Sequence, residues 1–131
     1  MATAIELLDV NMKAGSDLST KQFFIVKQTA ADTADITSAT TDVPFGVIVD
    51  PPKASGNGMA VQTDGIAKVV SDGSGTAIAA GDRVGTDASG RAIKCTTQDR
   101  PLLGESMDAS SASGAVIRVK LRCGTSFRTP A

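Results

Sequence analysis

The sequence predicts an all-β fold, a compact barrel or sandwich of about seven to nine short strands with little helix. Three observations support this prediction. Clusters of turn residues recur at short intervals, no convincing amphipathic helix lies between them, and the apolar residues are mostly Ala, Val and Ile, with only 3% aromatics. The length of 131 residues suits one domain. We expect an N-terminal arm over residues 1–15 and a single β domain over 16–131.

The first half of the β domain is expected to hold one helical turn and two strands. Residues 16–22 (SDLSTKQ) begin with two good helix-capping residues, which predicts the helical turn. The apolar run FFIVKQ at 23–28 has strong strand preference. Residues 30–42 show no clean period, which predicts a surface loop or a weak hairpin. PFGVIVD at 44–50 predicts the next strand, and the two prolines after it end it because proline cannot donate to a sheet.

The second half of the chain alternates strands with turns. MAVQTDGIAKVV at 59–70 predicts a long strand with a bulge or bend near Asp64 and Gly65. Further short strands are expected, in chain order, at 83–87, 91–95, 102–107 and 115–123.

The last predicted strand has the clearest alternation. One set of side chains is expected to enter the core: Ile117, Val119, Leu121 and Cys123. The other set is basic and is expected on the outside: Arg118, Lys120 and Arg122. This basic set is either a solvated face or a patch that meets an acidic partner.

The glycine-rich stretch 75–94 could be a phosphate-binding loop or a β-hairpin, and the residues favour the hairpin. A Walker loop needs lysine after its second glycine, but Asp82 follows Gly81. The dinucleotide-binding fingerprint fails as well, because no third glycine and no helix follow Gly73 and Gly75. We expect turns in which glycine adopts positive φ and Asp bonds its own backbone. The residues assigned to structural turns are Gly46, Gly65, Gly81, Asp82, Asp87 and Gly90.

The composition argues against an enzyme. The chain has no histidine, which removes Ser-His-Asp and Cys-His catalysis and imidazole metal sites. Asp32, Asp35 and Asp42 lack the spacing of a calcium loop and are interpreted as solvated. Lys68 is interpreted as a strand lysine that reaches solvent rather than as a Schiff-base lysine. We therefore expect no catalytic residue, no cofactor and no metal, and an enzyme that uses Asp and Lys alone is the least favoured function.

Charge and cysteine content narrow the partners. With 13 basic and 14 acidic residues the net charge is −1, so no basic field for nucleic acid is present. No apolar run approaches the ~20 residues that span a bilayer, and the N-terminus lacks the order of a signal peptide. Cys95 and Cys123 lack metal-site spacing and are either small buried thiols in a reducing cytoplasm or a disulfide. We expect no nucleic-acid and no membrane partner.

Taken in order, the predicted elements resemble a known family. The segments are DLSTKQFFIVK, PFGVIVDPP, AVQTDGIAKVV, IAAGDRVGTDASGRAIK and LLGESMDASSASGAVIRVKL, from about Asp17 to Leu121. Each is an ordinary strand-and-turn motif. Their order and spacing together resemble the small capsid cement, or decoration, proteins of tailed bacteriophages.

The resemblance implies a non-enzymatic virion protein, made in the host cytoplasm and seated on the outer surface of the capsid. Such a protein binds the expanded head as a homotrimer and stabilises contacts between major capsid subunits. The alternative function is a β-rich adhesion module on a virion or cell surface, against which the scarcity of aromatic anchors argues.

The resemblance also implies an N-terminal arm that pairs with a capsid element. Residues 3–9 (TAIELLD) are the candidate arm, because they could add an edge strand to a partner. The alternatives are a frayed terminus or an intramolecular first strand. The candidate capsid contacts are Thr3, Ile5, Leu7, Asp9, Arg118, Lys120 and Arg122.

Overall fold

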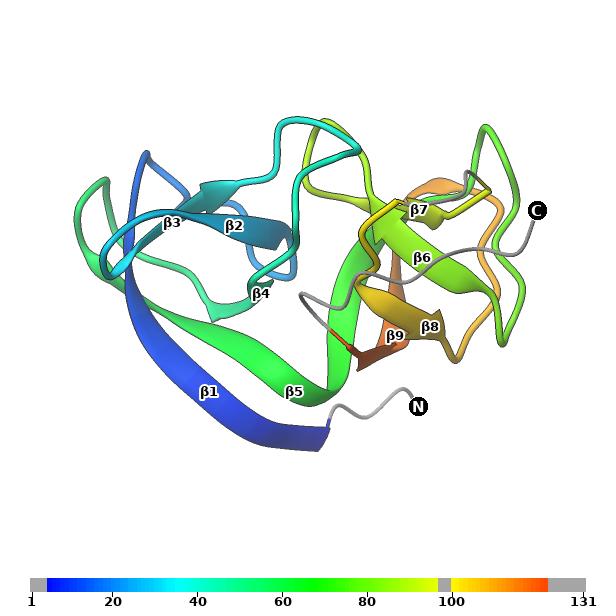
Figure 1. The fold of residues 1–131 in the computed structure, drawn as a ribbon, viewed down its shortest axis with the longest axis horizontal. Helices are drawn as coiled ribbons and strands as arrows, with labels where there is room; N and C mark the ends of the chain where they lie inside the picture. Colours follow the sequence, from blue (N-terminus) through cyan, green and yellow to red (C-terminus); the bar gives the residue numbers. More distant parts are fainter. Residues whose placement is uncertain (1–4, 97–99, 123–131) are drawn as a thin grey trace.

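The computed structural model describes residues 5–96 and 100–122, which form nine strands and no helix (Figure 1). These ranges accordingly contain no helix of the length and apolarity needed to cross a membrane. The strands are β1 (Ile5–Ala14), β2 (Ile25–Ala30), β3 (Thr33–Ile36), β4 (Gly46–Asp50), β5 (Gly58–Asp72), β6 (Arg83–Thr86), β7 (Ala92–Lys94), β8 (Gly104–Ser106) and β9 (Ser113–Leu121). The predicted all-β class is confirmed, and each of the seven predicted strands is present with its ends displaced by at most two residues.

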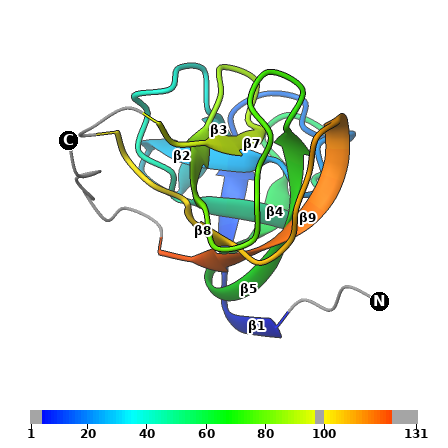
Figure 2. The same cartoon turned by 90° about the vertical axis from the view of Figure 1, so that its right-hand side faces the viewer.

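The strands are arranged around β5, the longest of them. In the order β5–β7–β6–β8–β9 the pairing returns to β5 and closes a five-stranded mixed barrel, which faces the viewer in Figure 2. The other four strands lie outside this barrel and pair in the order β1–β3–β2–β4, with β1 and β4 each also paired to β5. We call residues 5–65 the N lobe and residues 66–122 the C barrel.

Strand β5 changes partners at the predicted bulge. Gly65 has φ of +89°, a conformation that glycine adopts without steric cost. The Asp64 carboxylate accepts a hydrogen bond from the Gly65 N–H at 2.8 Å, and the register of β1 shifts opposite this point. Before the bulge β5 pairs with β4, and after it β5 pairs with β9.

Each half of the molecule has its own apolar core. The N-lobe core consists of Met12, Ala14, Leu18, Val26, Ala34, Ile48, Met59 and Val61. The C-barrel core consists of Ile25, Val47, Ala67, Val69, Ile78, Val84, Ala92, Leu103, Ile117, Val119 and Leu121. The predicted inward set of the last strand is thus confirmed for its first three members, and Cys123 lies outside the described residues.

Strands β2 and β4 serve both cores. Ile25 belongs to the C-barrel core and its neighbour Val26 to the N-lobe core, and Val47 and Ile48 divide in the same way. Because successive side chains of a strand point to opposite faces, these two strands form a layer between the cores. Burial on both faces explains why Ile25 and Val26, and likewise Val47 and Ile48, are adjacent apolar residues rather than an apolar residue followed by a polar one.

The N-terminal segment forms strand β1 instead of an extended arm in the isolated chain. Its pairing with β5 runs from Ile5 opposite Ile66 to Lys13 opposite Gly58. Met12 and Ala14 are buried in the N-lobe core, and the burial of these apolar side chains stabilises the pairing of β1 with β5. The intramolecular first strand, one of the alternatives for this segment, is therefore the arrangement that the chain adopts on its own.

Residues 16–22 do not form the predicted helical turn. The Asp17 carboxylate accepts a hydrogen bond from the Ser19 N–H at 3.1 Å, and the Lys21 N–H bonds back to the Leu18 carbonyl at 3.0 Å. Hydrogen bonds from Ser19 hold the pKa of Asp17 below its usual value. The capping chemistry is present, but it closes isolated turns because Leu18 is drawn into the N-lobe core.

The polar segment 30–42 is a hairpin followed by an ordered loop. β3 (Thr33–Ile36) pairs antiparallel with β2, so the weak-hairpin alternative is confirmed. In the loop, Asp42 Oδ2 accepts hydrogen bonds from the N–H groups of Ser38 and Ala39 and from Lys27 Nζ at 2.8–3.0 Å.

Gly46, expected at a turn, is instead the first residue of β4. A Cβ at this position would lie 2.5 Å from the Gln62 carbonyl oxygen and 2.6 Å from Val61 Cγ1. Glycine is required there because the backbones of β4 and β5 approach closely, and not because of a positive φ.

Candidate functional site

The turn residues of the glycine-rich stretch form the predicted hairpin. Asp87 Oδ1 accepts hydrogen bonds from the N–H groups of Ser89 and Arg91, each at 2.8 Å, and Gly90 has φ of +77°. The Gly90 carbonyl also accepts a hydrogen bond from the Ile25 N–H at 2.8 Å. The turn between β6 and β7 therefore attaches the C barrel to strand β2 of the N lobe.

The turn before β6 is also as predicted. Gly81 has φ of +90°, and Asp82 Oδ2 accepts a hydrogen bond from the Ala79 N–H at 2.8 Å. Both residues close the turn that leads into β6.

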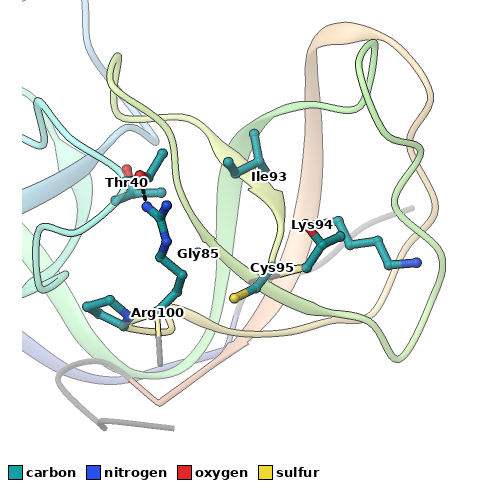
Figure 3. Close-up of a pocket in the computed structure, with 9 residues that line it drawn as sticks. Thr40, Gly85, Ile93, Lys94, Cys95 and Arg100 are labelled. Carbon is teal, nitrogen blue, oxygen red and sulfur yellow. Dashed lines mark hydrogen bonds between the residues drawn. The ribbon is translucent and has the colours of Figure 1, made fainter. Parts of the chain in front are cut away.

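A pocket opens between a loop of the N lobe and the C barrel (Figure 3). Its volume is about 100 Å³, well below the ~300–1,000 Å³ of typical ligand sites. Thr40, Ile93 and Cys95 help to line it, and Arg100 donates a hydrogen bond to the Thr40 hydroxyl (Figure 3). Among the described residues no group of three or more His, Cys, Asp or Glu is placed to hold a metal ion. A cavity of this volume fits a gap left where a loop of the N lobe packs against the C barrel better than it fits a site for a typical ligand.

The outer side of β5 and β9 carries a mixture of apolar and basic side chains. Three directly opposed pairs form it, and we call these six residues the outer face: Ile66 and Lys120, Lys68 and Arg118, Val70 and Val116. All six are half-buried or exposed, with Val116 47% exposed. Met107, 39% exposed, borders the face because its N–H donates to the Arg118 carbonyl at 2.8 Å. Exposed apolar groups beside cations are typical of interaction surfaces.

The structure places one residue of each nominated set, Ile5 of β1 and Lys120 of β9, in the same row of the sheet. Ile66 lies opposite Ile5 of β1 on one side and opposite Lys120 of β9 on the other. Lys120 is in turn opposite Glu105 of β8, which is opposite Arg83 of β6. Residues from the two ends of the chain therefore share one row across five strands, and sequence reasoning could not have placed them together.

The remaining nominated residues of β1 lie farther along the strand. Leu7 is in the irregular stretch where the β1 register shifts, and Asp9 is exposed, opposite Gln62. Thr3 lies outside the described residues.

Strand β1 leaves one edge without a strand partner. β3 pairs only with Lys13 and Ala14, so from Ile5 to Met12 the edge away from β5 is unpaired among the residues that the structure describes. An unpaired edge presents backbone donors and acceptors that can pair with another chain. This edge is continuous with the outer face through the opposed pair Ile5 and Ile66.

Two of the three nominated basic residues are already ion-paired. The Arg118 guanidinium forms a bidentate ion pair with Asp108, with Nη2–Oδ1 and Nε–Oδ2 distances of 2.9 and 3.0 Å. The backbone N–H of Arg118 donates to the same carboxylate. Hydrogen bonds from Arg118 hold the pKa of Asp108 below its usual value, and Asp108 raises the pKa of Arg118. Arg122 Nε lies 2.7 Å from Glu105 Oε1. Lys120 and Lys68 have no carboxylate partner among the described residues.

Charge is divided unevenly between the two halves. Residues 1–65 carry eight acidic and four basic side chains, whereas residues 66–131 carry six acidic and nine basic ones. In the described part of the C barrel every carboxylate has a cationic partner: Asp72 and Asp87 with Arg91, Asp82 with Lys94, Glu105 with Arg122, and Asp108 with Arg118. Sequence analysis missed this asymmetry and the place of Lys68 beside Arg118, although a count of charges by halves would have indicated the first.

The N lobe shows the opposite situation. Asp42 pairs with Lys27 at 2.9 Å. The other carboxylates have no cationic partner among the side chains that the structure describes: Asp9, Asp17, Asp32, Asp35, Asp50 and Asp64. Lys13, Lys21 and Lys53 likewise lack a carboxylate partner, so among the described side chains the unpaired charge of the N lobe has a negative excess of three, whereas that of the outer face is positive.

Comparisons with known proteins agree with this fold. A family model described as phage cement protein matches residues 2–121. Among solved structures, the chain is similar to the N base of the head fiber gp8.5 in bacteriophage phi29, with a TM-score of 0.66 and 15% identity over 95% of this chain and 98% of that chain. At this identity the likeness concerns the fold. No curated protein matches the sequence.

Proposed function

Because the chain belongs to the phage cement protein family, which is a family of structural head proteins and not of enzymes, we propose that it is a capsid decoration protein. It binds the outer surface of an expanded head and stabilises contacts between major capsid subunits. The partner is the major capsid protein.

One observation carries the choice of contact surface. The unpaired edge of β1 and the basic residues of β9 lie on either side of Ile66 and form one continuous surface. The contact proposed here uses the residues nominated from the sequence, Thr3, Ile5, Leu7, Asp9, Arg118, Lys120 and Arg122. The backbone of β1 pairs with an extended capsid segment, and the outer face packs beside that segment.

A homotrimer, which the family resemblance implies, would set three such surfaces around one junction between capsid subunits. Binding through several linked contacts raises the overall avidity well above that of one contact. Each copy then needs only modest affinity to hold neighbouring subunits together.

The adhesion alternative has less support. Sugar-binding surfaces usually present exposed aromatic rings, and Phe23, Phe24 and Phe45 are each half-buried. Phe127 lies outside the described residues.

The test is co-sedimentation of the purified protein with expanded heads that lack it, with copies counted per head. We expect saturation at a fixed multiple of the major capsid subunits and weaker binding to unexpanded heads. Absence of binding to either head form would overturn the proposal. Sedimentation equilibrium of the free protein, with a trimer mass expected, tests the oligomeric state.

A further inference from the structure

We infer that the outer face docks on an acidic patch of the capsid, so that the protein stands on the shell with its C barrel and the adjoining start of β1 inward and the rest of the N lobe outward. This inference rests on the proposed function and adds the chemistry of the partner surface and the orientation of the bound protein.

The first step is the charge that the outer face has available for a partner. Arg118 forms an ion pair with Asp108. Glu105, directly opposite Lys120, forms an ion pair with Arg122. Lys68 and Lys120 form no ion pair with a described carboxylate. Carboxylates of a partner can therefore form ion pairs with Lys68 and Lys120 without breaking an existing ion pair.

The second step is the apolar part of the same face. Val70 and Val116 lie directly opposite one another, and Ile66 lies opposite Lys120. An apolar centre next to polar or charged groups is the usual anatomy of a protein interface, in which burial supplies affinity and charge supplies register. The matching capsid surface is apolar with carboxylates at its rim.

The third step is the orientation. Apart from Asp9 of β1, five described carboxylates of the N lobe lack a cationic partner (Asp17, Asp32, Asp35, Asp50 and Asp64), against three lysines without a carboxylate partner (Lys13, Lys21 and Lys53). The excess is negative, the same sign as an acidic patch, so bringing this part of the molecule toward that patch is unfavourable. Since exposed charges are screened beyond about 8 Å at physiological salt, each end of the molecule responds to the surface closest to it. The asymmetry of charge therefore favours approach with the C barrel first.

A second copy of the chain fits this face less well than the capsid does. The acids of the N lobe are scattered over β1, the loop before β2, the β2–β3 turn, β3, the end of β4 and the bulge of β5. The exposed large apolar side chain of the described N lobe is Val43 alone. The N lobe of another copy thus lacks an apolar patch rimmed by acids, whereas the outer face is continuous with the β1 edge proposed to contact the capsid.

The experiment compares two double variants with the same change in net charge. Lys68→Glu with Lys120→Glu reverses the outer face. The matched control, Lys13→Glu with Lys53→Glu, changes two exposed lysines at the end of the N lobe farthest from the C barrel. Circular dichroism and a thermal melt verify that each variant folds, and Lys68→Arg with Lys120→Arg serves as the charge-preserving rescue.

We expect the outer-face variant to bind expanded heads about tenfold more weakly or worse, while the control and the arginine variant stay within about twofold of wild type. Wild-type binding should weaken as salt rises from about 50 to about 300 mM, and the outer-face variant should lose most of that dependence. Lysine labelling on saturated heads should spare Lys68 and Lys120 and still modify Lys53.

Equal losses in the two charge-reversal variants would mean that only net charge matters and would overturn the inference, as would no loss in either. Loss of self-association by the outer-face variant, with binding per copy unchanged, would assign the face to a second copy and also overturn it. Failure of the wild-type protein to bind any head would instead contradict the proposed function.

Discussion

In the C barrel every described carboxylate has a cationic partner on the same barrel, whereas of the carboxylates that the structure describes in the N lobe Asp42 alone has one. The cores differ in the opposite sense. The N-lobe core is built from residues of the N lobe, but the C-barrel core also takes Ile25 and Val47 from strands β2 and β4. The C barrel thus pairs each of its described carboxylates, leaving Lys68 and Lys120 without a partner, but it needs side chains of the N lobe to complete its core. The core of the N lobe is built from its own residues, but most of its carboxylates have no cationic partner and one edge of β1 has no strand partner among the residues that the structure describes.

The comparison indicates how one small chain can hold its shape and still present a surface for assembly. The two halves are joined by β5, by the layer of β2 and β4 between the cores, and by the hydroxyls of Thr37 and Thr86, which bond to each other in a buried position. The unsatisfied features lie away from this joint, at the β1 edge and on the outer face. Three sets of substitutions test the comparison, in order of decreasing effect.

The largest effect is expected at Ile25. Replacement by Ala should lower the free energy of unfolding by about 3–4 kcal/mol, because a fully buried side chain is removed from the C-barrel core. Since Ile25 belongs to β2 of the N lobe, we expect both halves to lose stability together. Hydrogen exchange measured separately on β1 and β3 and on β6 and β8 checks this, since the chain has no Trp or Tyr for fluorescence.

Val26→Ala is the matched control, because the next side chain enters the N-lobe core instead. It should also destabilise the protein, by about 2 kcal/mol. If Ile25→Ala increased exchange only in β6 and β8 and left β1 and β3 protected, the two halves would be independent and the shared-layer interpretation would be wrong.

A smaller effect is expected at the buried hydroxyl pair that links the halves. Thr37→Val and Thr86→Val should each cost about 1–2 kcal/mol, because each leaves the other hydroxyl without this partner. The double variant should cost less than the sum, since both polar groups are then replaced by apolar ones of similar shape. Urea denaturation of the four proteins in this cycle measures the coupling, and strictly additive costs would mean that the pair does not join the lobes.

The smallest effect concerns the ion pairs that distinguish the two halves. Hydrogen bonds from Arg118 lower the pKa of Asp108. In Asp42 partial burial opposes ionisation, but hydrogen bonds from Lys27, Ser38 and Ala39 still bring the pKa below its usual value. A carboxyl whose pKa is lower in the folded state stabilises the protein above the unfolded pKa of about 3.9, and this contribution is lost as the pH falls through the folded pKa.

We therefore expect Asp42→Asn and Asp108→Asn each to cost at most about 1 kcal/mol at neutral pH, because both side chains are partly exposed, and to cost nothing once the pH is well below the folded pKa. Thermal melts between about pH 2 and 7 measure the difference. Asp50→Asn is the control, because Asp50 is exposed and has no cationic partner among the described residues. Equal sensitivity to pH in all three variants would contradict this account.

The positions of seven of the nine strands were predictable because local chemistry sets them. The prolines after Asp50 end β4, positive φ at Gly81 and Gly90 closes turns, and the alternation in β9 sends Ile117 and Val119 inward. The helical turn predicted at 16–22 was wrong. Capping residues such as Ser16 and Asp17 show that the backbone can turn there, but a helix also needs an apolar face that packs against the core, and the residues that follow do not supply one. Gly46 was predicted at a turn but begins β4. Glycine is needed there because the backbones of β4 and β5 lie close together, and the neighbouring residues in the sequence do not indicate such a contact between distant segments.

What the sequence by itself determined is the all-β class, the place along the chain of seven of the nine strands and the lack of histidine for catalysis or metal binding. Those depend on φ preferences and a period of two, which neighbouring residues decide. Only the tertiary structure decided that Ile25 and Val26 enter different cores, that residues 5–14 pair with β5, and that Ile5 and Lys120 lie on either side of Ile66. Pairing between distant segments depends on which surfaces bury each other once the whole chain has folded, and no local pattern along the chain specifies that.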